Sequence, residues 1–177
     1  MKKPFPLSKV YRLLETGPVV MVSTALRGRP NIMTMSWHTM IDFEPPLVGV
    51  IIGNGSYSFE LLKKSKECVI NIPTVDLAEK AVACGNCSGR TVDKFRVFGL
   101  TPKAASCVKA PLIDECYVNL ECRLIDLHMA YEYNLFILEV LKAWIDPSKK
   151  NPRTIHHKGK GCFMVSGKTI KIASRMK

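Results

Sequence analysis

Four stretches of the chain show the hydrophobic pattern of β-strands. Residues 31–37 alternate apolar with polar or small side chains, which is typical of a half-buried strand. Residues 47–52 are apolar apart from Gly49, which indicates a buried strand with room for a bulge or a close approach. Residues 117–128 and 133–145 alternate again, and the short segment between them predicts an antiparallel pair.

Shorter elements are expected between these strands. Residues 19–25 form a further strand, and the turn at residues 27–30 joins it to the strand 31–37 as a hairpin. Another strand is expected at residues 67–72, and a small C-terminal hairpin is expected from residues 162–165 and 168–172. The sequence predicts short helices at residues 7–16, 59–65 and 75–83.

Together these elements predict a mainly β fold. Six or seven strands, a few short helices and the lack of an internal repeat favour a β-barrel decorated with helices. Because most connections are short turns, the sheet should be largely antiparallel. The length of 177 residues suggests one domain over residues 1–177, with a basic extension from about residue 146 to 177.

The loop after the buried strand 47–52 has the composition of an anion-binding site. Residues 53–58 supply backbone N–H groups and hydroxyls just before a helix. The first N–H groups of a helix lack intrahelical partners, and the helix dipole favours negative charge, so the loop suits a phosphate. Serines at this position also serve as ordinary helix caps. The residues alone leave both interpretations open.

The chain is strongly basic. Its 26 Lys and Arg residues against 15 Asp and Glu residues give a net charge of +11, which attracts nucleotides, nucleic acid and acidic proteins. Between residues 142 and 177, ten basic residues face one acidic residue, Asp146. A basic region of this kind is more often a solvated surface than a binding site, which argues against nucleic acid as the main partner.

No sequence signal points to a membrane or to secretion. No apolar run approaches the ~18 residues that a spanning helix needs. The charged first residues lack the apolar segment of a signal peptide. We therefore expect a cytoplasmic protein.

Seven cysteines in such a protein predict reduced thiols rather than a disulfide framework. Cys84 and Cys87 form a lone C-x-x-C, and without a second pair they do not indicate a structural zinc site. A redox C-x-x-C needs a helix N-terminus to stabilise its thiolate, whereas this one follows the predicted helix. Two small buried or half-buried thiols are the favoured interpretation, with dithiol redox activity as the alternative.

Several short motifs occur in order over residues 16–172. They are Gly17-Pro18-Val19-Val20, residues 31–37, Pro45-Pro46-Leu47-Val48-Gly49-Val50, residues 56–59, residues 68–72, Ser88-Gly89-Arg90, Asp93-Lys94-Phe95 and residues 135–140. In this order and spacing the chain resembles the flavin reductase-like, flavoredoxin-type family of FMN-binding split-barrel proteins.

The resemblance implies a six-stranded split β-barrel, a homodimer and one FMN per subunit near the dimer interface. It implies that the flavin ring lies beside one strand, at Asn31, Met33, Thr34, Met35, Ser36 and Trp37. The phosphate loop then falls on Gly53, Ser56, Tyr57, Ser58 and Phe59. Positive charge and a further hydroxyl near the phosphate would come from Ser88, Arg90 and Lys94, in keeping with phosphate chemistry.

Two groups of residues limit the resemblance. Tyr133 and Asn134 stand where family members commonly carry a charged or His residue. His156 and His157 lie in a basic loop, where histidines are more often solvated than catalytic. His38 follows the flavin strand and is expected to be structural or adjacent to the flavin.

The predicted function is electron transfer by a flavoprotein. Bound FMN supplies the chemistry, so the sequence names no catalytic residue and no metal ligand. The donor would be NAD(P)H or a small redox protein, and the acceptor a flavin, a metal ion or a protein. No G-x-G-x-x-G fingerprint occurs, which fits transient nicotinamide docking or none. The alternatives are a non-catalytic basic barrel that binds nucleic acid or an acidic protein, and a thiol-redox protein using Cys84 and Cys87.

Overall fold

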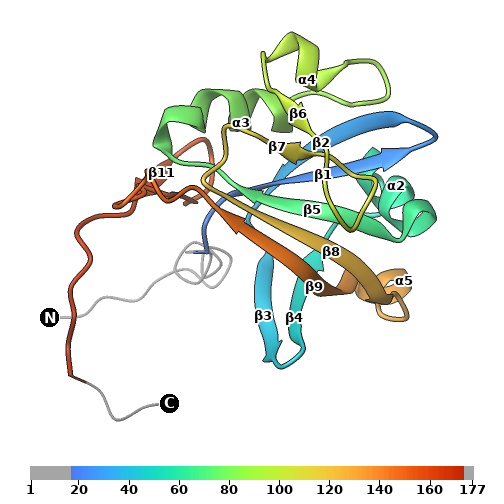
Figure 1. Ribbon diagram of the computed structural model, residues 1–177. Helices are drawn as coiled ribbons and strands as arrows, with labels where there is room; N and C mark the ends of the chain where they lie inside the picture. Colours follow the sequence, from blue (N-terminus) through green and yellow to red (C-terminus); the bar gives the residue numbers. More distant parts are fainter. Residues whose placement is uncertain (1–16, 174–177) are drawn as a thin grey trace, which may run out of the picture.

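A computed structural model of the chain describes residues 17–173 (Figure 1). The helix predicted at residues 7–16 lies outside this range. The main sheet is antiparallel throughout, in the order β2-β1-β5-β8-β9-β4-β3. Its seven strands are β1 (Val20–Leu26), β2 (Arg29–Met35), β3 (His38–Phe43), β4 (Pro46–Ile51), β5 (Glu67–Ile72), β8 (Val118–Asp126) and β9 (Leu135–Ile145).

Short helices and two small hairpins surround this sheet (Figure 1). The helical elements are α2 (Tyr57–Ser65), the 3-10 turn η2 (Val75–Leu77), α3 (Ala78–Gly85), α4 (Lys94–Val97) and α5 (Ala130–Tyr133). The small hairpins pair β6 (Pro102–Lys103) with β7 (Leu112–Ile113), and β10 (Ile155–His157) with β11 (Phe163–Val165). Within residues 17–173, no helix has the length and apolar content needed to cross a membrane.

The β1–β2 hairpin shows how local sequence shapes the sheet. Its register runs from Val20 opposite Met35 to Leu26 opposite Arg29. Only Arg27 and Gly28 lie between the strands, and both have positive φ angles, of 52° and 76°. A two-residue turn with positive φ at both positions matches the right-handed twist of the strands.

The same hairpin is buried on both faces. Val20 and Val22 belong to a core that also contains Phe59 and Phe136, whereas Met21 and Ile32 belong to a second core. The second core is formed with buried residues of α3 and α4, among them Ala81, Cys84 and Phe95. This double burial holds β2 between α2 and α3, where the candidate site lies.

The structure confirms a mainly β, antiparallel split barrel with a few short helices, and the sheet is not closed. The main sheet has one strand more than the six that the family resemblance implied, because residues 38–43 form β3. These residues are mostly exposed and show no alternation of apolar and polar side chains, so their strand conformation comes from pairing with β4. The β3–β4 hairpin projects away from the rest of the sheet (Figure 1).

The predicted C-terminal hairpin is wrong. β11 pairs with β10, which lies in the segment expected to be a polar loop, and residues 167–173 have no regular structure. The reversal is made at Gly159, Lys160 and Gly161, all with positive φ. Three-residue strands are too short to show a period, so the sequence pattern could not identify this pair.

Candidate functional site

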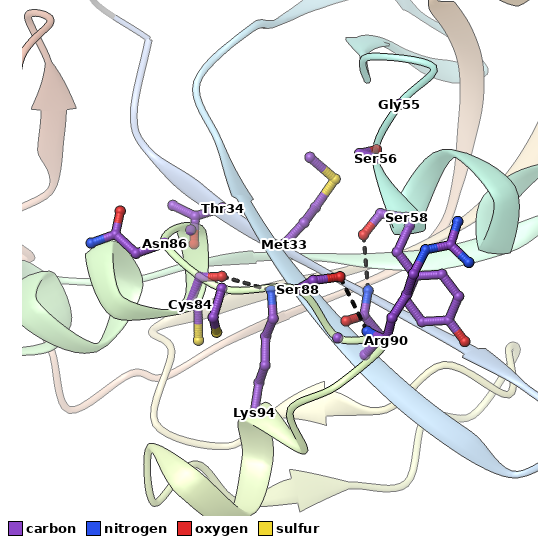
Figure 2. Close-up of a pocket in the computed structure, with 15 residues that line it drawn as sticks. Met33, Thr34, Gly55, Ser56, Ser58, Cys84, Asn86, Ser88, Arg90 and Lys94 are labelled. Carbon is purple, nitrogen blue, oxygen red and sulfur yellow. Dashed lines mark hydrogen bonds between the residues drawn. The ribbon is translucent and has the colours of Figure 1, made fainter.

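Two adjoining pockets lie beside β2 and together form one cleft. The first has a volume of about 330 Å³ and is lined by three segments: β2, the start of α2, and the connection from α3 to α4 (Figure 2). The second, of about 240 Å³, shares Thr34, Gly85 and Asn86 with the first and reaches the β10–β11 hairpin at His157 and Phe163. The first pocket alone, and the two together, fall in the range of small-molecule sites, which typically measure about 300–1,000 Å³.

The start of α2 brings two serine hydroxyls to the first pocket. Ser56 is the N-cap, and its Oγ accepts a hydrogen bond from the Phe59 backbone N–H at 3.2 Å. Ser58 Oγ accepts a hydrogen bond from Asn31 Nδ2 at 2.8 Å (Figure 2). In both bonds the hydroxyl uses a lone pair, so each serine keeps its O–H proton for a ligand.

Asn31 is the buried polar group of this pocket. Its side chain is 3% exposed, and Oδ1 has no hydrogen-bond partner among the described residues. Gly89 passes so close that a Cβ built there would lie 1.8 Å from Asn31 Oδ1. An unsatisfied buried acceptor costs about 1–3 kcal/mol. A ligand hydroxyl or N–H that donated to Oδ1 would recover that cost.

Arg90 supplies an exposed positive charge at the same end. Its guanidinium lies 4.7 Å from the centroid of the Tyr57 ring, within the range of cation–π contacts. Its backbone N–H donates to Ser88 Oγ at 3.2 Å (Figure 2). Among the described residues, no carboxylate forms an ion pair with Arg90. The guanidinium is therefore oriented and electrostatically uncompensated.

Lys94 plays a different part. It is buried, and its Nζ donates to the carbonyl oxygen of Ile32 at 2.7 Å. It also donates to the carbonyl oxygen of Cys84 at 2.6 Å (Figure 2). Burial lowers the pKa of Lys94, although the neighbouring Cys87 and Cys84 counteract part of this effect. The ammonium thus ties β2 to α3, and one of its three N–H groups remains for the pocket.

The C-x-x-C cysteines also line the first pocket. Cys84 is buried in the last turn of α3, and Cys87 is half-buried just after the helix, as predicted. Burial raises the pKa of Cys84 to about 11, with a smaller opposing effect from Lys94. A thiol with this pKa is not the activated thiolate that redox dithiols require. In the described part of the chain, no group of three or more His, Cys, Asp or Glu side chains is placed to hold a metal.

A family model describes this architecture. The model of the flavin reductase like domain matches residues 12–163. The chain belongs to the flavin reductase-like family. The resemblance inferred from the sequence motifs is thereby confirmed.

Relatives and solved structures of the family match over almost the whole chain. An uncharacterized Escherichia coli K12 protein, YddH, is 33% identical over 183 residues, covering 94% of this chain and 96% of YddH. The flavoredoxin of Desulfovibrio vulgaris (Miyazaki F) has a TM-score of 0.85 and 26% identity, covering 98% and 97% of the two chains. An FMN-binding domain of a flavin reductase-like enzyme from Shewanella baltica OS155 has a TM-score of 0.83 and 29% identity, with 96% of each chain covered.

Most of the residues that the family resemblance implied come together in the two pockets. Nine line the first pocket: Asn31, Met33, Thr34, Ser56, Tyr57, Ser58, Ser88, Arg90 and Lys94. Met35 and Ser36 line the second. The two pockets share Thr34 beside β2, so one elongated ligand can contact both sets of residues.

Three implied residues line neither of these two pockets, among the described residues that form them. The Phe59 ring packs in the core, edge-on to Phe136 at 5.1 Å, so only its backbone N–H serves the α2 cap. Trp37 is 54% exposed just before β3. Gly53 lies in the exposed loop ahead of α2.

Several lining residues were not predicted from the sequence to be part of the flavin site. They are Gly55, Cys84, Gly85, Asn86, Cys87 and Gly89 in the first pocket, and His157 and Phe163 in the second. The run of small residues after α3 was visible, but its approach to β2 depends on the long-range Lys94 contacts. His38 is structural in this fold, because its Nε2 is hydrogen-bonded to the Pro18 carbonyl at 2.8 Å.

Proposed function

We propose that this protein is an FMN-binding oxidoreductase that holds the flavin along β2. The main support for this proposal is the first pocket, where Ser56, Ser58 and Arg90 lie close to Asn31, whose Oδ1 has no hydrogen-bond partner among the described residues. The family and its FMN-binding solved members support this assignment. When bound, FMN supplies one- and two-electron chemistry, and the protein supplies binding, orientation and tuning.

The polar end of the cleft suits the phosphate. The free O–H groups of Ser56 and Ser58 would donate to phosphate oxygens, and the Arg90 guanidinium would neutralise part of a charge close to −2. Ser88 adds a third hydroxyl beside Arg90. Asn31 Oδ1 would accept a hydrogen bond from a hydroxyl of the ribityl chain. Each donor and acceptor in this pocket then has a chemically matching group on FMN.

The other end suits the flavin ring. Met33 and Met35 offer apolar surface along β2, and Thr34 Oγ1 donates to the Ala81 carbonyl at 2.6 Å, which fixes the hydroxyl between β2 and α3. His157 and Phe163, whose rings lie 5.3 Å apart, close the second pocket from the β10–β11 side. Shielding from water on this side would protect a reduced ring. No residue is assigned as an acid, base or nucleophile.

The proposed electron donor is NAD(P)H or a small redox protein, and the acceptor a flavin, a metal ion or a protein. The net charge of +11 favours encounter with phosphorylated nucleotides or acidic redox partners.

We also propose that the protein is a homodimer. The β3–β4 hairpin carries exposed apolar side chains, with Met40 53%, Ile41 48% and Phe43 87% exposed. Trp37 and Ile51 extend this surface at its base. A concentration of exposed large apolar side chains on one hairpin is typical of a protein interface. A second copy would bury it close to the ring end of the cleft, because β3 follows directly after β2.

The absorption spectrum of the purified protein after incubation with FMN and desalting tests the flavin assignment. We expect flavin bands near ~450 and ~370 nm to be retained. In a Ser56→Ala/Ser58→Ala variant the FMN Kd should rise by about 100-fold or more, because two hydrogen bonds to a charged group are lost and each contributes about 1.5–3 kcal/mol.

Ser65→Ala is the matched control. Ser65 lies at the other end of α2, and its Oγ donates to the Glu67 carbonyl at 3.0 Å. This variant should bind FMN like the parent. Absence of retained flavin, together with a salt-dependent shift of DNA or RNA, would instead support the basic binding protein.

A further inference from the structure

A third pocket adjoins the phosphate end of the cleft. It has a volume of about 340 Å³ and is formed by the β1–β2 turn, the start of α2 and the segment that leads into α4. Tyr57, Gly89 and Arg90 line both this pocket and the first one. The two pockets therefore meet at Arg90, and a ligand held by the serines can continue into the third pocket.

Three guanidinium groups line this third pocket. Arg29 comes from the start of β2, Arg90 from the loop after α3, and Arg96 from α4. None of the three forms an ion pair with a carboxylate in the described part of the chain. We call this third pocket the arginine pocket.

One carboxylate, Asp93, lies in the arginine pocket, but it is engaged locally. Its Oδ1 accepts the Arg96 backbone N–H at 3.2 Å as the N-cap of α4. Three positive charges therefore face a single negative charge, so the arginine pocket is net positive. Guanidinium groups bind phosphate oxygens through pairs of parallel hydrogen bonds, which makes a phosphate the anion that fits best.

The walls favour a nucleotide phosphate over a free ion. Pro30 and Val92 add apolar surface to the arginine pocket, against which a ribose or a base can pack. The stacking of Arg90 on Tyr57 holds its guanidinium at the boundary, where it can contact phosphates on both sides. A pocket near Trp144, of about 490 Å³, lacks this character, because its Lys103 is paired with Asp114 at 2.8 Å.

We propose that the arginine pocket binds the phosphate of an adenosine nucleotide next to the flavin phosphate site. The placement of the neighbouring phosphate rests on the proposed function. This adenosine phosphate can belong to either of two ligands. One is FAD, whose riboflavin phosphate would lie in the first pocket beside Ser56 and Ser58. The other is NAD(P)H, which would bind while FMN occupies the first pocket. In either case Arg29 and Arg96 select for a dinucleotide.

The test compares the parent with Arg29→Gln/Arg96→Gln, because neither residue lines the first pocket. FAD and FMN are titrated into the flavin-free protein by fluorescence, and 5′-AMP and 2′,5′-ADP into the FMN-saturated protein by calorimetry. For the FAD source, the FAD Kd should rise about 10-fold or more in the variant while the FMN Kd stays within about 2-fold. For the NAD(P)H source, 5′-AMP or 2′,5′-ADP binding should weaken by the same factor.

Lys150→Gln/Arg153→Gln is the charge-matched control. It also removes two positive charges, from exposed positions outside all the pockets described above, and should change none of these affinities. Affinities for FAD and for the adenosine phosphates that are equal in the arginine variant and the parent would overturn the proposal. An equal loss of these affinities in the arginine variant and in the control variant would also overturn it, because such a loss would come from the lower net charge of the protein.

The failure of the two proposals can be distinguished. If the flavin-free protein binds neither FMN nor FAD, the proposed function fails. The arginine pocket still stands if 5′-AMP or 2′,5′-ADP binds that protein in an Arg29- and Arg96-dependent manner. A different result would refute only the arginine pocket. In that case FMN binds, neither 5′-AMP nor 2′,5′-ADP binds, and the FAD Kd is the same in the parent and in the arginine variant.

Discussion

At the residue scale, the pair Asn31 and Gly89 sets the shape of the phosphate end. Asn31 donates to Ser58 from one side of its amide, and Gly89 crosses at the other side, where Oδ1 has no partner among the described residues. Only the missing Cβ of Gly89 permits this approach. The glycine therefore serves close packing of the loop against β2, and its φ angle lies outside the left-handed region.

Gly89→Ala tests this packing. Its new Cβ would clash with the Asn31 amide, which would have to rotate and give up its bond to Ser58. We expect a loss of about 1–3 kcal/mol in the free energy of unfolding, measured by urea titration of the flavin-free protein. FMN affinity should fall as well, because Ser58 loses its orientation.

Gly53→Ala is the control for this substitution. A Cβ at Gly53 meets no atom within 4 Å. Its stability should match the parent within about 0.5 kcal/mol. If Gly89→Ala unfolds at the same urea concentration as Gly53→Ala, the close approach does not exist in solution.

At the element scale, Glu121 fastens a loop and a neighbouring strand to the centre of the sheet. It is a fully buried residue on β8, and its carboxylate accepts hydrogen bonds from the Ser106 N–H at 3.0 Å and from Trp144 Nε1 at 2.7 Å. The Cys107 N–H donates to the same carboxylate. One side chain thus joins the loop before β7, β8 and the end of β9.

The charge of Glu121 makes this junction dependent on pH. Burial alone would raise the pKa of Glu121, but hydrogen bonds from Ser106, Trp144 and Cys107 and the nearby Lys142 hold it below 4.5. A carboxyl whose pKa is lower in the folded state stabilises the fold above its ordinary pKa. That contribution is lost as the pH falls below about 4.5 towards the folded-state pKa.

Glu121→Gln should therefore destabilise the protein by about 2–3 kcal/mol at neutral pH, since the hydrogen bonds to a charged acceptor are lost. The difference from the parent should shrink when urea unfolding is repeated at about pH 4 and below. Glu79→Gln, at an exposed position in the first turn of α3, is the control and should cost less than about 1 kcal/mol, from the helix dipole alone. A gap between Glu121→Gln and the parent that stays constant with pH would contradict this account.

At the scale of the whole molecule, the β3–β4 hairpin projects from the sheet (Figure 1), and it carries the exposed side chains of Met40, Ile41 and Phe43. Ile41→Asp/Phe43→Asp should convert the proposed dimer into a monomer, because burying unpaired carboxylates in an apolar interface is strongly unfavourable. Light scattering coupled to size-exclusion chromatography measures the change.

The control for the hairpin variant is Ile170→Asp/Ile172→Asp. These side chains are exposed to a similar degree, 71% and 76%, but lie in the segment without regular structure. The control should keep the mass of the parent. A parent that is already monomeric at micromolar concentration would refute the homodimer.

Much of the fold follows from local pattern. The strands at residues 19–25, 31–37, 47–52 and 67–72 and the long pair that became β8 and β9 carry clear periods, and each occurs within a few residues of the expected bounds. The start of α2 could be predicted because serine, here Ser56, is a preferred N-cap residue. Strands β3 and β10 lack such a period and are ordered by their partners β4 and β11, so no local pattern identified them.

For the candidate site, the sequence determined which chemical groups are present: the serines ahead of α2, the methionines and hydroxyls of β2, and Arg90 after the small-residue run. The tertiary structure decided how they are used. It gave two N–H groups of Lys94 to the Ile32 and Cys84 carbonyls, placed the Phe59 ring in the core, and joined Arg29 and Arg96 beside Arg90. The physical reason is sequence separation. Capping and strand periodicity act between neighbours in the chain, whereas these contacts join residues up to 77 positions apart, such as Phe59 and Phe136, and only the packed sheet brings them together.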